Sequence, residues 1–210
     1  MRKFDAVIIA NGEFPSHAVP LEVLRNAPQL VCCDGAIVNL PALASHLSPL
    51  IIGDGDSVPA EYHDRLIQVD EQEDNDLTKA TRYCLQQGWH RIAYLGTTGK
   101  REDHTLGNIS LLMRYYMEMG VDGMMFTNTG FFTPVKGDRT FPSFAGQQVS
   151  IFNFGSAFIH SKGLKWGSYA YQQWWQGTLN EAVSDSFTLC ADSYYLVYQT
   201  YDVKSEESSR

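Results

Sequence analysis

The sequence predicts an α/β protein of two domains, an N-terminal α/β/α domain built on a mostly parallel sheet over residues 1–134 and a small C-terminal all-β sandwich over residues 135–210. Two observations carry this prediction. Strand patterns alternate with helical patterns in the first part, which is typical of a parallel sheet covered by helices. The last 76 residues hold 15 of the 26 aromatic residues but only 13 of the 40 charged ones, so the composition changes where the second domain begins.

Four short apolar segments in the first part each end in a turn rich in Gly, Asp or Thr. They are residues 4–10, 30–33, 49–52 and 91–95, and the turns after them begin with Asn11-Gly12, Asp34-Gly35, Gly53-Asp54 and Gly96-Thr97. Continuous apolar runs of this length, stopped by turn residues, predict buried strands.

Two segments have the spacing of helices. The first has apolar or small residues at Leu77, Ala80 or Thr81, and Cys84, after a predicted cap at Asn75 or Asp76. The second has them at Leu106, Ile109, Met113 and Tyr116, with Asp103 as the predicted cap and Gly120 as the predicted end.

The second part reads as short strands. Residues 148–154, 169–173 and 194–201 are rich in β-branched and aromatic residues, with Gly and Ser between them and no convincing helix. This pattern favours a sandwich or barrel.

Charge excludes several classes of partner. The net charge of −8 argues against nucleic acid, whose phosphates bind clustered cations, and against an anionic membrane surface. No apolar run approaches the ~20 residues of a membrane helix, and the first residues do not have the organisation of a signal peptide. Four cysteines without a disulfide or metal spacing predict a cytoplasmic location.

Carboxylates gather in two of the predicted turns. In an open α/β sheet, ligands bind beyond the carboxyl ends of the strands. Asp54 and Asp56 lie two residues apart between glycines, which suits Mg²⁺, although an ordinary surface turn has the same residues. Five acids occur within residues 70–76; such a run is usually a solvated face or a favourable helix start, and Asp76, at the helix start, is its candidate for the crevice.

The segment 96–104 combines glycines, hydroxyls and the cations Lys100 and Arg101 between a strand and a helix. Such a place suits a phosphate group, although it matches neither the P-loop nor the GxGxxG pattern. The alternative is a plain connection capped by Asp103. Asp103 and His104 could form a catalytic pair, but a lone histidine is more often structural. Taken together, the turns predict a Mg²⁺–nucleotide site.

The ordered motifs DGA (residues 34–36), GDGDS (53–57), NDLTKA (75–80) and GTTGKREDHTLGN (96–108) resemble the thiamine pyrophosphokinase family over nearly the whole chain. The resemblance implies a kinase that transfers the pyrophosphoryl group of ATP to the hydroxyl of thiamine, giving AMP and thiamine diphosphate. It also implies Mg²⁺ as cofactor, and a homodimer that binds thiamine between its subunits.

The resemblance carries over to particular residues. It implies Mg²⁺ ligands at Asp34, Asp54, Asp56 and Asp76, with Asp103 joining Asp54, Asp56 and Asp76 in catalysis. The implied nucleotide-binding residues are Asn11, Gly12, Asp34, Gly96, Thr97, Thr98, Gly99, Arg101, His104 and Asn108. Those for thiamine are Thr178, Leu179 and Asn180.

Tryptophan suits a cationic aromatic substrate, so Trp174 or Trp175, just before the implied thiamine residues, is the stacking candidate. The alternative for either tryptophan is a place in the core or in a dimer interface.

Four positions depart from the family pattern: Asn75, Lys100, Glu102 and Leu179 stand where Thr, Gly, an apolar residue and Ser are common. The residues leave open whether Asp76 or Asp103 accepts the hydroxyl proton, or whether positioning alone suffices. Two other functions also remain open at this point. One is a different Mg²⁺-dependent phosphohydrolase that uses water as the nucleophile. The other is a non-catalytic metal- and ligand-binding protein.

Overall fold

The computed structural model describes residues 2–40, 44, 46–69, 71 and 73–203. Asp70 and Gln72 of the acidic run, and the tail after Val203, lie outside the described residues. The chain divides into two compact units, Met1–Asn128 and Thr129–Arg210. This division lies a few residues before the change of composition, ahead of the strand β7 (Gly130–Lys136).

The first unit contains a parallel sheet in the order β6-β5-β1-β2-β3-β4. Its strands are β1 (Ala6–Ile9), β2 (Leu30–Cys33), β3 (Leu50–Gly53), β4 (Leu66–Gln68), β5 (Ile92–Leu95) and β6 (Met124–Phe126). Every residue of β1, β2 and β5 is buried, because helices cover both faces of a parallel sheet. The four predicted strands are confirmed, whereas the three-residue strands β4 and β6 were not predicted.

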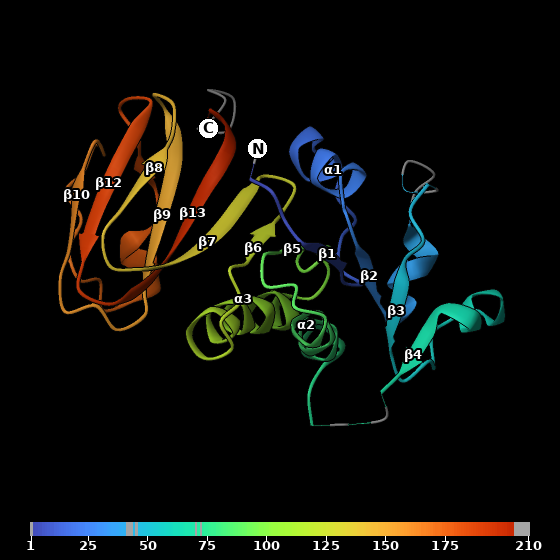
Figure 1. The fold of residues 1–210 in the computed structure, drawn as a ribbon. Helices are drawn as coiled ribbons and strands as arrows, with labels where there is room; N and C mark the ends of the chain where they lie inside the picture. The colour runs from blue at the N-terminus through green and yellow to red at the C-terminus, as the bar shows by residue number, and fades with distance from the viewer. Residues whose placement is uncertain (1, 41–43, 45, 70, 72, 204–210) are drawn as a thin grey trace. The chain divides into compact units, whose positions relative to one another are not determined.

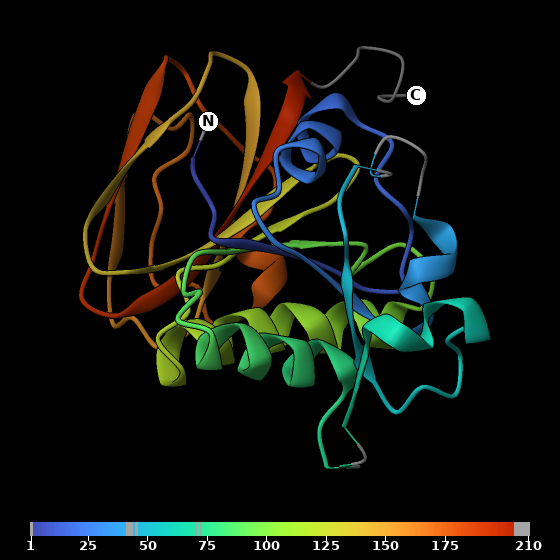
Figure 2. The same ribbon diagram turned by 45° about the vertical axis from the view of Figure 1, so that its right-hand side comes forward.

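Helices α2 (Asp76–Gln86) and α3 (Glu102–Glu118) lie side by side on one face of this sheet, and α1 (Ala18–Arg25) lies on the other (Figures 1 and 2). Two 3₁₀ helices, η1 (Asp34–Asn39) and η3 (Ala60–Arg65), follow β2 and β3. The predicted face of α2 is confirmed, since Leu77, Ala80, Thr81 and Cys84 are all buried. Helix α1 was not predicted.

The prediction for α3 was correct in place but wrong in detail. The helix buries Leu112, Met113 and Tyr115, whereas Leu106 is 55% exposed. Its cap residue is Arg101, without a side-chain cap bond, so the cap assigned to Asp103 was wrong. Gly120, with a φ of 71°, follows the end of the helix as predicted.

The path of the chain creates a switch in strand order. From β1 the chain moves outward through β2, β3 and β4, then returns through α2 to β5 on the opposite side of β1. Crossovers that leave a central strand in opposite directions open a crevice at the carboxyl ends of β1 and β5.

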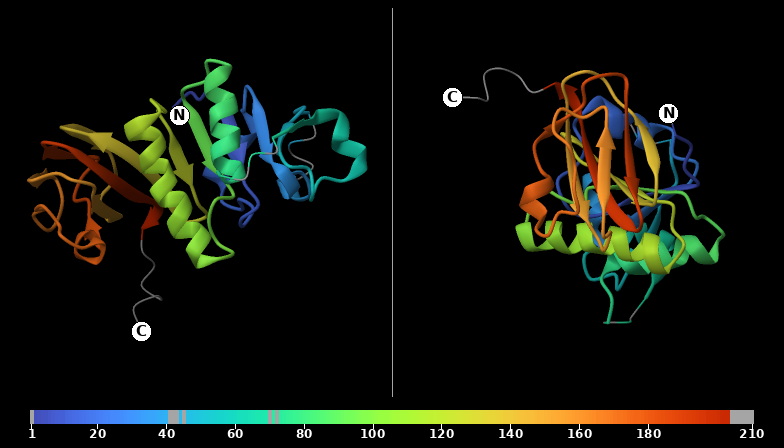
Figure 3. Two further views of the ribbon diagram at one scale, coloured as in Figure 1. Left: turned by 90° about the horizontal axis from the view of Figure 1, so that it is seen from below. Right: turned by 90° about the vertical axis from the view of Figure 1, so that its left-hand side faces the viewer.

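The second unit contains two antiparallel sheets, β11-β9-β13-β7 and β10-β12-β8 (Figure 3). Besides β7, its strands are β8 (Arg139–Pro142), β9 (Gln147–Asn153), β10 (Ile159–Lys162), β11 (Asn180–Glu181), β12 (Ser186–Ala191) and β13 (Tyr194–Val203). Apolar side chains from both sheets form one core, among them Ile151 of β9 and Leu189 of β12. The sandwich prediction is therefore confirmed.

One predicted strand of the second unit was wrong. Residues 169–173 are irregular and lead into a short 3₁₀ helix, η4 (Trp174–Gly177). Segment 169–173 has the aromatic composition of a strand, but Tyr169 and Tyr171 contact each other instead, with ring centroids 4.5 Å apart.

Among the residues with described structure, no helix has the length and apolar character needed to cross a bilayer.

Asp5 fixes the entry into the sheet. Its carboxylate accepts hydrogen bonds from the backbone N–H of Arg91 (2.9 Å) and of His90 (3.2 Å), and from Nε of Arg91 (3.0 Å). The hydrogen bond from the Arg91 side chain is the main reason why the pKa of Asp5 is lowered.

We expect Asp5→Ala to lower the free energy of unfolding by about 1–3 kcal/mol at pH 7, because backbone donors lose their acceptor. A lowered folded-state pKa stabilises the fold above the unfolded pKa, near 4, and this contribution is lost as the pH falls through the folded value. Urea denaturation of both proteins at pH 7 and pH 3 measures the difference, which should shrink at pH 3. Asp64→Ala, at an exposed aspartate, is the control; an equal loss in that variant would contradict the assignment.

Candidate active site

The carboxyl ends of β1, β2 and β5 open into a cleft with a volume of about 460 Å³. The turns after these strands and the first residues of α2 and α3 form its walls. It is lined by Ala10, Asn11, Gly12, Cys33, Asp34, Gly35, Ser57, Asn75, Asp76, Leu77, Gly96, Thr97, Thr98, Lys100, Arg101, His104, Thr105 and Asn108. The cleft therefore lies at the switch in strand order.

The turns after β1 and β5 approach each other backbone to backbone. The N–H of Gly12 donates to the carbonyl of Gly96 (2.6 Å), and the N–H of Glu13 donates to the carbonyl of Thr98 (2.7 Å). A Cβ on Gly12 would lie 2.3 Å from the Gly96 oxygen, and one on Gly96 would lie 2.4 Å from the Ala10 oxygen. Both positions therefore require glycine.

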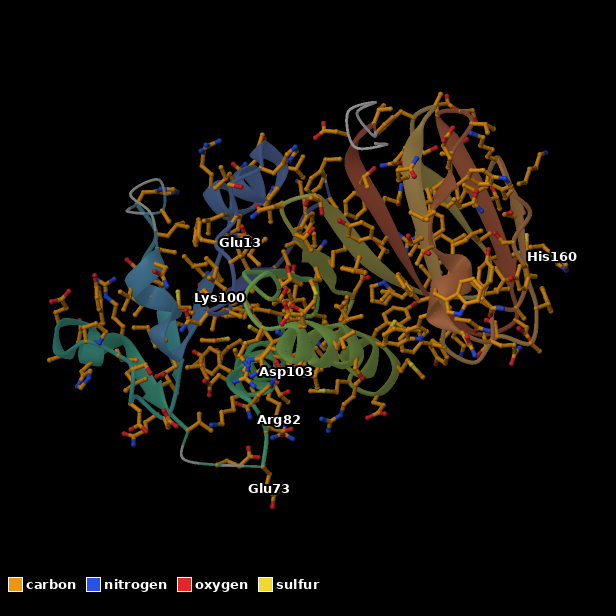
Figure 4. All side chains as sticks on the ribbon, turned by 180° about the vertical axis from the view of Figure 1, so that it is seen from behind. Glu13, Glu73, Arg82, Lys100, Asp103 and His160 are labelled. Atoms are coloured by element: carbon orange, nitrogen blue, oxygen red, sulfur yellow. The ribbon has the colours of Figure 1, made fainter. Side chains whose placement is uncertain are left out.

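Cationic side chains line the β5 side of the cleft. Lys100 Nζ donates to Asn11 Oδ1 (3.3 Å), and Glu13 and Lys100 lie near each other at this end of the sheet (Figure 4). Arg101 and His104 also line the cleft. Arg101, the N-cap residue of α3, makes no side-chain cap bond, although the His104 N–H of the first turn donates to Asp103 Oδ1 (2.9 Å). A helix start beside a cleft suits an anion.

Asp103 does not line the cleft. Its two carboxylate oxygens accept hydrogen bonds from Arg101 at 2.6 Å and 3.1 Å, and both side chains are exposed. This pairing lowers the pKa of Asp103, which makes its carboxylate a weaker proton acceptor. Asp103 instead orients the guanidinium of Arg101.

Asp34 lies on the floor of the cleft. It is only 9% exposed, its φ is +34°, and its Oδ1 is buried with no hydrogen-bond partner in the described part of the chain. A Cβ on Gly53 would lie 3.0 Å from that oxygen, so the glycine of the GDGDS motif makes room for the carboxylate. An unpaired buried carboxylate oxygen beside a cleft is a ready acceptor for a cation.

Asp76 begins α2 and faces the same cleft. Burial is the main cause that raises its pKa, and the charges of Asp34 and Asp54 raise it further. The buried Lys79 opposes this shift, with its Nζ 3.4 Å from Asp76 Oδ1. Asp34 and Asp54 are thus both close enough to Asp76 for their charges to disfavour its ionised form.

Asp54 and Asp56 lie outside the cleft lining. Asp54 is partly buried, whereas Asp56 is exposed and donates its backbone N–H to Asp54 Oδ1 (3.2 Å). In the parts of the chain that are described, no three His, Cys, Asp or Glu side chains come together as a metal site. Any bound cation would therefore need further ligands from a substrate or water.

A second pocket, of about 340 Å³, lies within the second unit. It is lined by Trp166, Gly167, Tyr169, Tyr171, Gln176, Thr178, Leu179 and Asn180. The buried Asn180 holds its two sides together, since its Oδ1 accepts from Trp166 N–H (3.2 Å) and its Nδ2 donates to Trp166 O (2.8 Å). Leu179 is 72% exposed in the left-handed region, with a φ of 66°.

The tryptophans selected from the sequence do not line this pocket. Trp174 packs against Phe152 and Phe154, with ring centroids 5.8 Å and 5.6 Å away. Trp175 is 69% exposed and donates its Nε1–H to Gln173 (2.6 Å). The aromatic side of the pocket comes from Trp166, Tyr169 and Tyr171. Sequence reasoning missed the two tyrosines because it assigned residues 169–173 to a strand, and it did not single out Trp166. The other residues predicted for thiamine, Thr178, Leu179 and Asn180, do line the pocket.

The structure brings most of the predicted nucleotide-binding residues together. Asn11, Gly12, Asp34, Gly96, Thr97, Thr98, Arg101, His104 and Asn108 all line the cleft, and so does Asp76, which was predicted as a metal ligand. Gly99 does not line it; its φ is +91°, and a Cβ there would lie 2.5 Å from that of Glu13. Sequence reasoning did not single out Cys33, the last residue of β2, or Thr105, which lies within the motif of residues 96–108.

Two family models match the chain. The thiamin pyrophosphokinase catalytic domain matches residues 21–121, and the thiamin pyrophosphokinase substrate-binding domain matches residues 130–198. No curated protein sequence matches it.

Solved structures share the fold. Thiamin pyrophosphokinase from Geobacillus thermodenitrificans is 21% identical with a TM-score of 0.74, over 95% of this chain and 98% of that one. The Candida albicans protein is 15% identical with a TM-score of 0.75 (94% and 90% covered), and the yeast protein is 16% identical with a TM-score of 0.75 (96% and 88% covered). Because the two domain models together cover both structural units, the chain belongs to the thiamin pyrophosphokinase family and is a kinase of that family.

Proposed function

We propose that ATP binds with Mg²⁺ in the cleft of the first unit and that its pyrophosphoryl group passes to the hydroxyl of thiamine, giving AMP and thiamine diphosphate. The family match makes the thiamin pyrophosphokinase reaction the favoured one over nucleotide hydrolysis. One observation carries the placement of the site. The cleft at the strand-order switch gathers carboxylates on one side and glycine turns with cations on the other.

The donor set fits Mg²⁺. Asp34 offers a buried, unpaired oxygen, and Asp76 is a second carboxylate on the same cleft. Mg²⁺ is usually held by one or two carboxylates together with substrate phosphates and water, which agrees with the lack of a three-residue cluster in the described chain. We propose that Asp34 and Asp76, with Asp54 beside them, hold the ion, which neutralises charge on the phosphates when bound.

The side chains on the β5 side position the nucleotide in this proposal. Lys100, Arg101 and His104 face the cleft beside the start of α3 and would bind phosphate oxygens. The two-pronged contact with Asp103 holds the Arg101 guanidinium in one orientation. Phosphoryl transfer requires mainly positioning and charge stabilisation, so no separate base is needed. The low basicity of Asp103 argues against that role for it.

The aromatic pocket of the second unit is the proposed thiamine site. It lies within the matched substrate-binding domain and is lined by Trp166 and two tyrosines. A cationic aromatic ring binds well against such faces. Leu179 places an apolar side chain where the family resemblance has serine, so an apolar contact replaces a hydroxyl there.

We also propose a homodimer and a cytoplasmic location. Trp166, Trp175, Leu179 and Val183 of the second unit are each more than half exposed, and apolar surface of this kind favours a partner subunit. Sedimentation velocity measures the mass of the particle in solution directly, and this mass distinguishes a dimer from a monomer. The four cysteines are free, which suits a reducing compartment.

The reaction is tested by incubating the chain with ATP, Mg²⁺ and thiamine and following phosphorus by NMR. We expect AMP and thiamine diphosphate to form in equal amounts and only when thiamine is present. Asp54→Asn should lower the rate by about 100-fold, as for the loss of one electrostatic contact at a transition state. Asp64→Asn, at an exposed aspartate, should leave the rate unchanged. AMP or phosphate released equally without thiamine would instead identify a hydrolase.

The close approach of the two turns gives a second test. Gly12→Ala should raise the KM for ATP by about tenfold or more, because the Cβ forces the turns after β1 and β5 apart. Gly107→Ala is the matched control, since a Cβ there meets nothing within 4 Å inside α3. It should keep the KM and stabilise the fold by about 0.5–1 kcal/mol. Equal KM values for Gly12→Ala and the unaltered chain would refute the nucleotide site.

Substitutions of Trp166 and Trp175 test which tryptophan contacts thiamine. Trp166 lines the pocket of the second unit, whereas Trp175 is a candidate from the sequence. Trp166→Ala should raise the KM for thiamine by about tenfold, as expected for an aromatic contact with a cation, and leave the KM for ATP unchanged. Trp175→Ala should leave both values unchanged, because Trp175 lies outside the pocket. Initial-rate kinetics measure both constants, and the reverse pattern would restore the sequence-based choice.

A further inference from the structure

A chain of buried hydroxyl groups lies behind the cleft, within the first unit. Thr78 Oγ1 lies 2.6 Å from the hydroxyl of Tyr115 and 2.9 Å from Asn75 Oδ1. Asn75 Oδ1 also accepts the backbone N–H of Thr78 (3.0 Å), which is the N-cap bond of α2. Thr78 and Tyr115 are 1% and 0% exposed, so their hydroxyls are shielded from water, whereas Asn75 is exposed at the cleft.

The direction of these hydrogen bonds follows from the donors. The amide oxygen of Asn75 can only accept, so the Thr78 hydroxyl uses its one proton there. The Tyr115 hydroxyl must therefore donate to Thr78 Oγ1. The three groups form a one-way chain from α3, through the first turn of α2, to the residue that caps α2.

This chain ends at the wall of the cleft. Asn75, Asp76 and Leu77 all line the cleft, and they are the cap and first two residues of α2. Tyr115 itself does not line the cleft, and its ring packs against Tyr94 of β5 with centroids 5.9 Å apart. A phenylalanine would fill the same space without desolvating a hydroxyl, so the hydroxyl acts through its hydrogen bond.

We propose that Tyr115 is a positioning residue of the active site, whose hydroxyl fixes the first turn of α2 and thereby the direction in which Asp76 enters the cleft. The inference rests on the proposed function. Without the Tyr115 donor, Thr78 Oγ1 is left as a buried acceptor with one hydrogen bond fewer, which costs free energy, so the bond from Thr78 to Asn75 is no longer held in this arrangement. A loosened cap moves Asp76 relative to Asp34.

The same core supplies a matched control. The Tyr94 hydroxyl lies 3.2 Å from Thr81 Oγ1, which donates to the carbonyl of Leu77 (2.7 Å). Tyr94 is as fully buried as Tyr115, but its hydroxyl contacts Thr81 and, through it, the Leu77 carbonyl, and not the Thr78–Asn75 pair that caps α2. Tyr94→Phe therefore removes the same atom from the same core without touching the cap.

The test measures the binding of Mg²⁺·α,β-methylene-ATP, which resists cleavage at the reacting bond, by titration calorimetry, together with the melting temperature. We expect Tyr115→Phe to weaken this binding by about fivefold, the size of a lost helix cap, with thiamine binding within twofold of the unaltered chain. Tyr94→Phe should lower the melting temperature about as much as Tyr115→Phe does, and it should leave nucleotide binding unchanged.

Substitutions at Thr78 test whether Tyr115 acts on the cap of α2 through the Thr78 hydroxyl. Thr78→Ser keeps the hydroxyl and should bind the nucleotide analogue within twofold of the unaltered chain. Thr78→Val should reproduce the fivefold loss, and adding Tyr115→Phe to it should cause no further loss, because both act through one chain.

Two results would overturn the inference: unchanged nucleotide binding in Tyr115→Phe, or an equal loss in Tyr94→Phe, which would mark a purely structural role. The proposed function fails separately, if the unaltered chain binds the analogue but forms no thiamine diphosphate. A chain that binds no Mg²⁺·nucleotide at all would overturn both.

Discussion

The backbone contact between the turns after β1 and β5 is the constraint on which the site depends. The hydrogen bond from Gly12 to Gly96 closes the two turns at the point where the strand order switches. A Cβ on Gly12 or Gly96 would clash with backbone oxygen atoms, so both positions hold glycine. The cleft opens beside this contact. Because β2 and β5 both pair with β1, the turns that follow these strands are positioned relative to this contact.

The carboxylates of the cleft influence one another. The charges of Asp34 and Asp54 raise the pKa of Asp76, and Asp34 has an oxygen with no partner in the described chain. Lys79 offsets part of this repulsion from inside α2. Part of the net charge of −8 is therefore concentrated at one place, which supports the proposal that a divalent ion binds there. The acidic segment ahead of α2 differs, because Glu71 and Asp74 pair with Arg82 and so hold that segment in place.

The central strands and the start of α2 could be predicted from the sequence, because both depend on residues that are neighbours along the chain. Buried central strands are continuous apolar runs, and the cap at Asn75 depends on a side chain next to its own helix, so both can be recognised locally. The face of α3 could not be predicted in the same way, because Leu106 belongs to the helical period yet lies where the helix start is exposed at the cleft. Thr178, Leu179 and Asn180 of the aromatic pocket were predicted from the family resemblance. Trp166 was missed because it meets Asn180 through long-range hydrogen bonds, and no spacing along the chain records that contact.

The position of the site also explains why buried residues behind it matter for its chemistry. Both α2 and α3 begin at the cleft and run away from it along one face of the sheet (Figure 2). A carboxylate at a helix start is aimed by the first turn, and the first turn is held by whatever its cap and its buried side touch. In α2 those contacts are hydroxyls and aromatic rings from α3 and β5. Because these polar contacts are sealed from water, they hold one arrangement strongly when complete and are costly when broken. The geometry of the acids in the cleft is therefore set by the packing of two helices on the sheet as much as by the turns that carry the recognisable motifs.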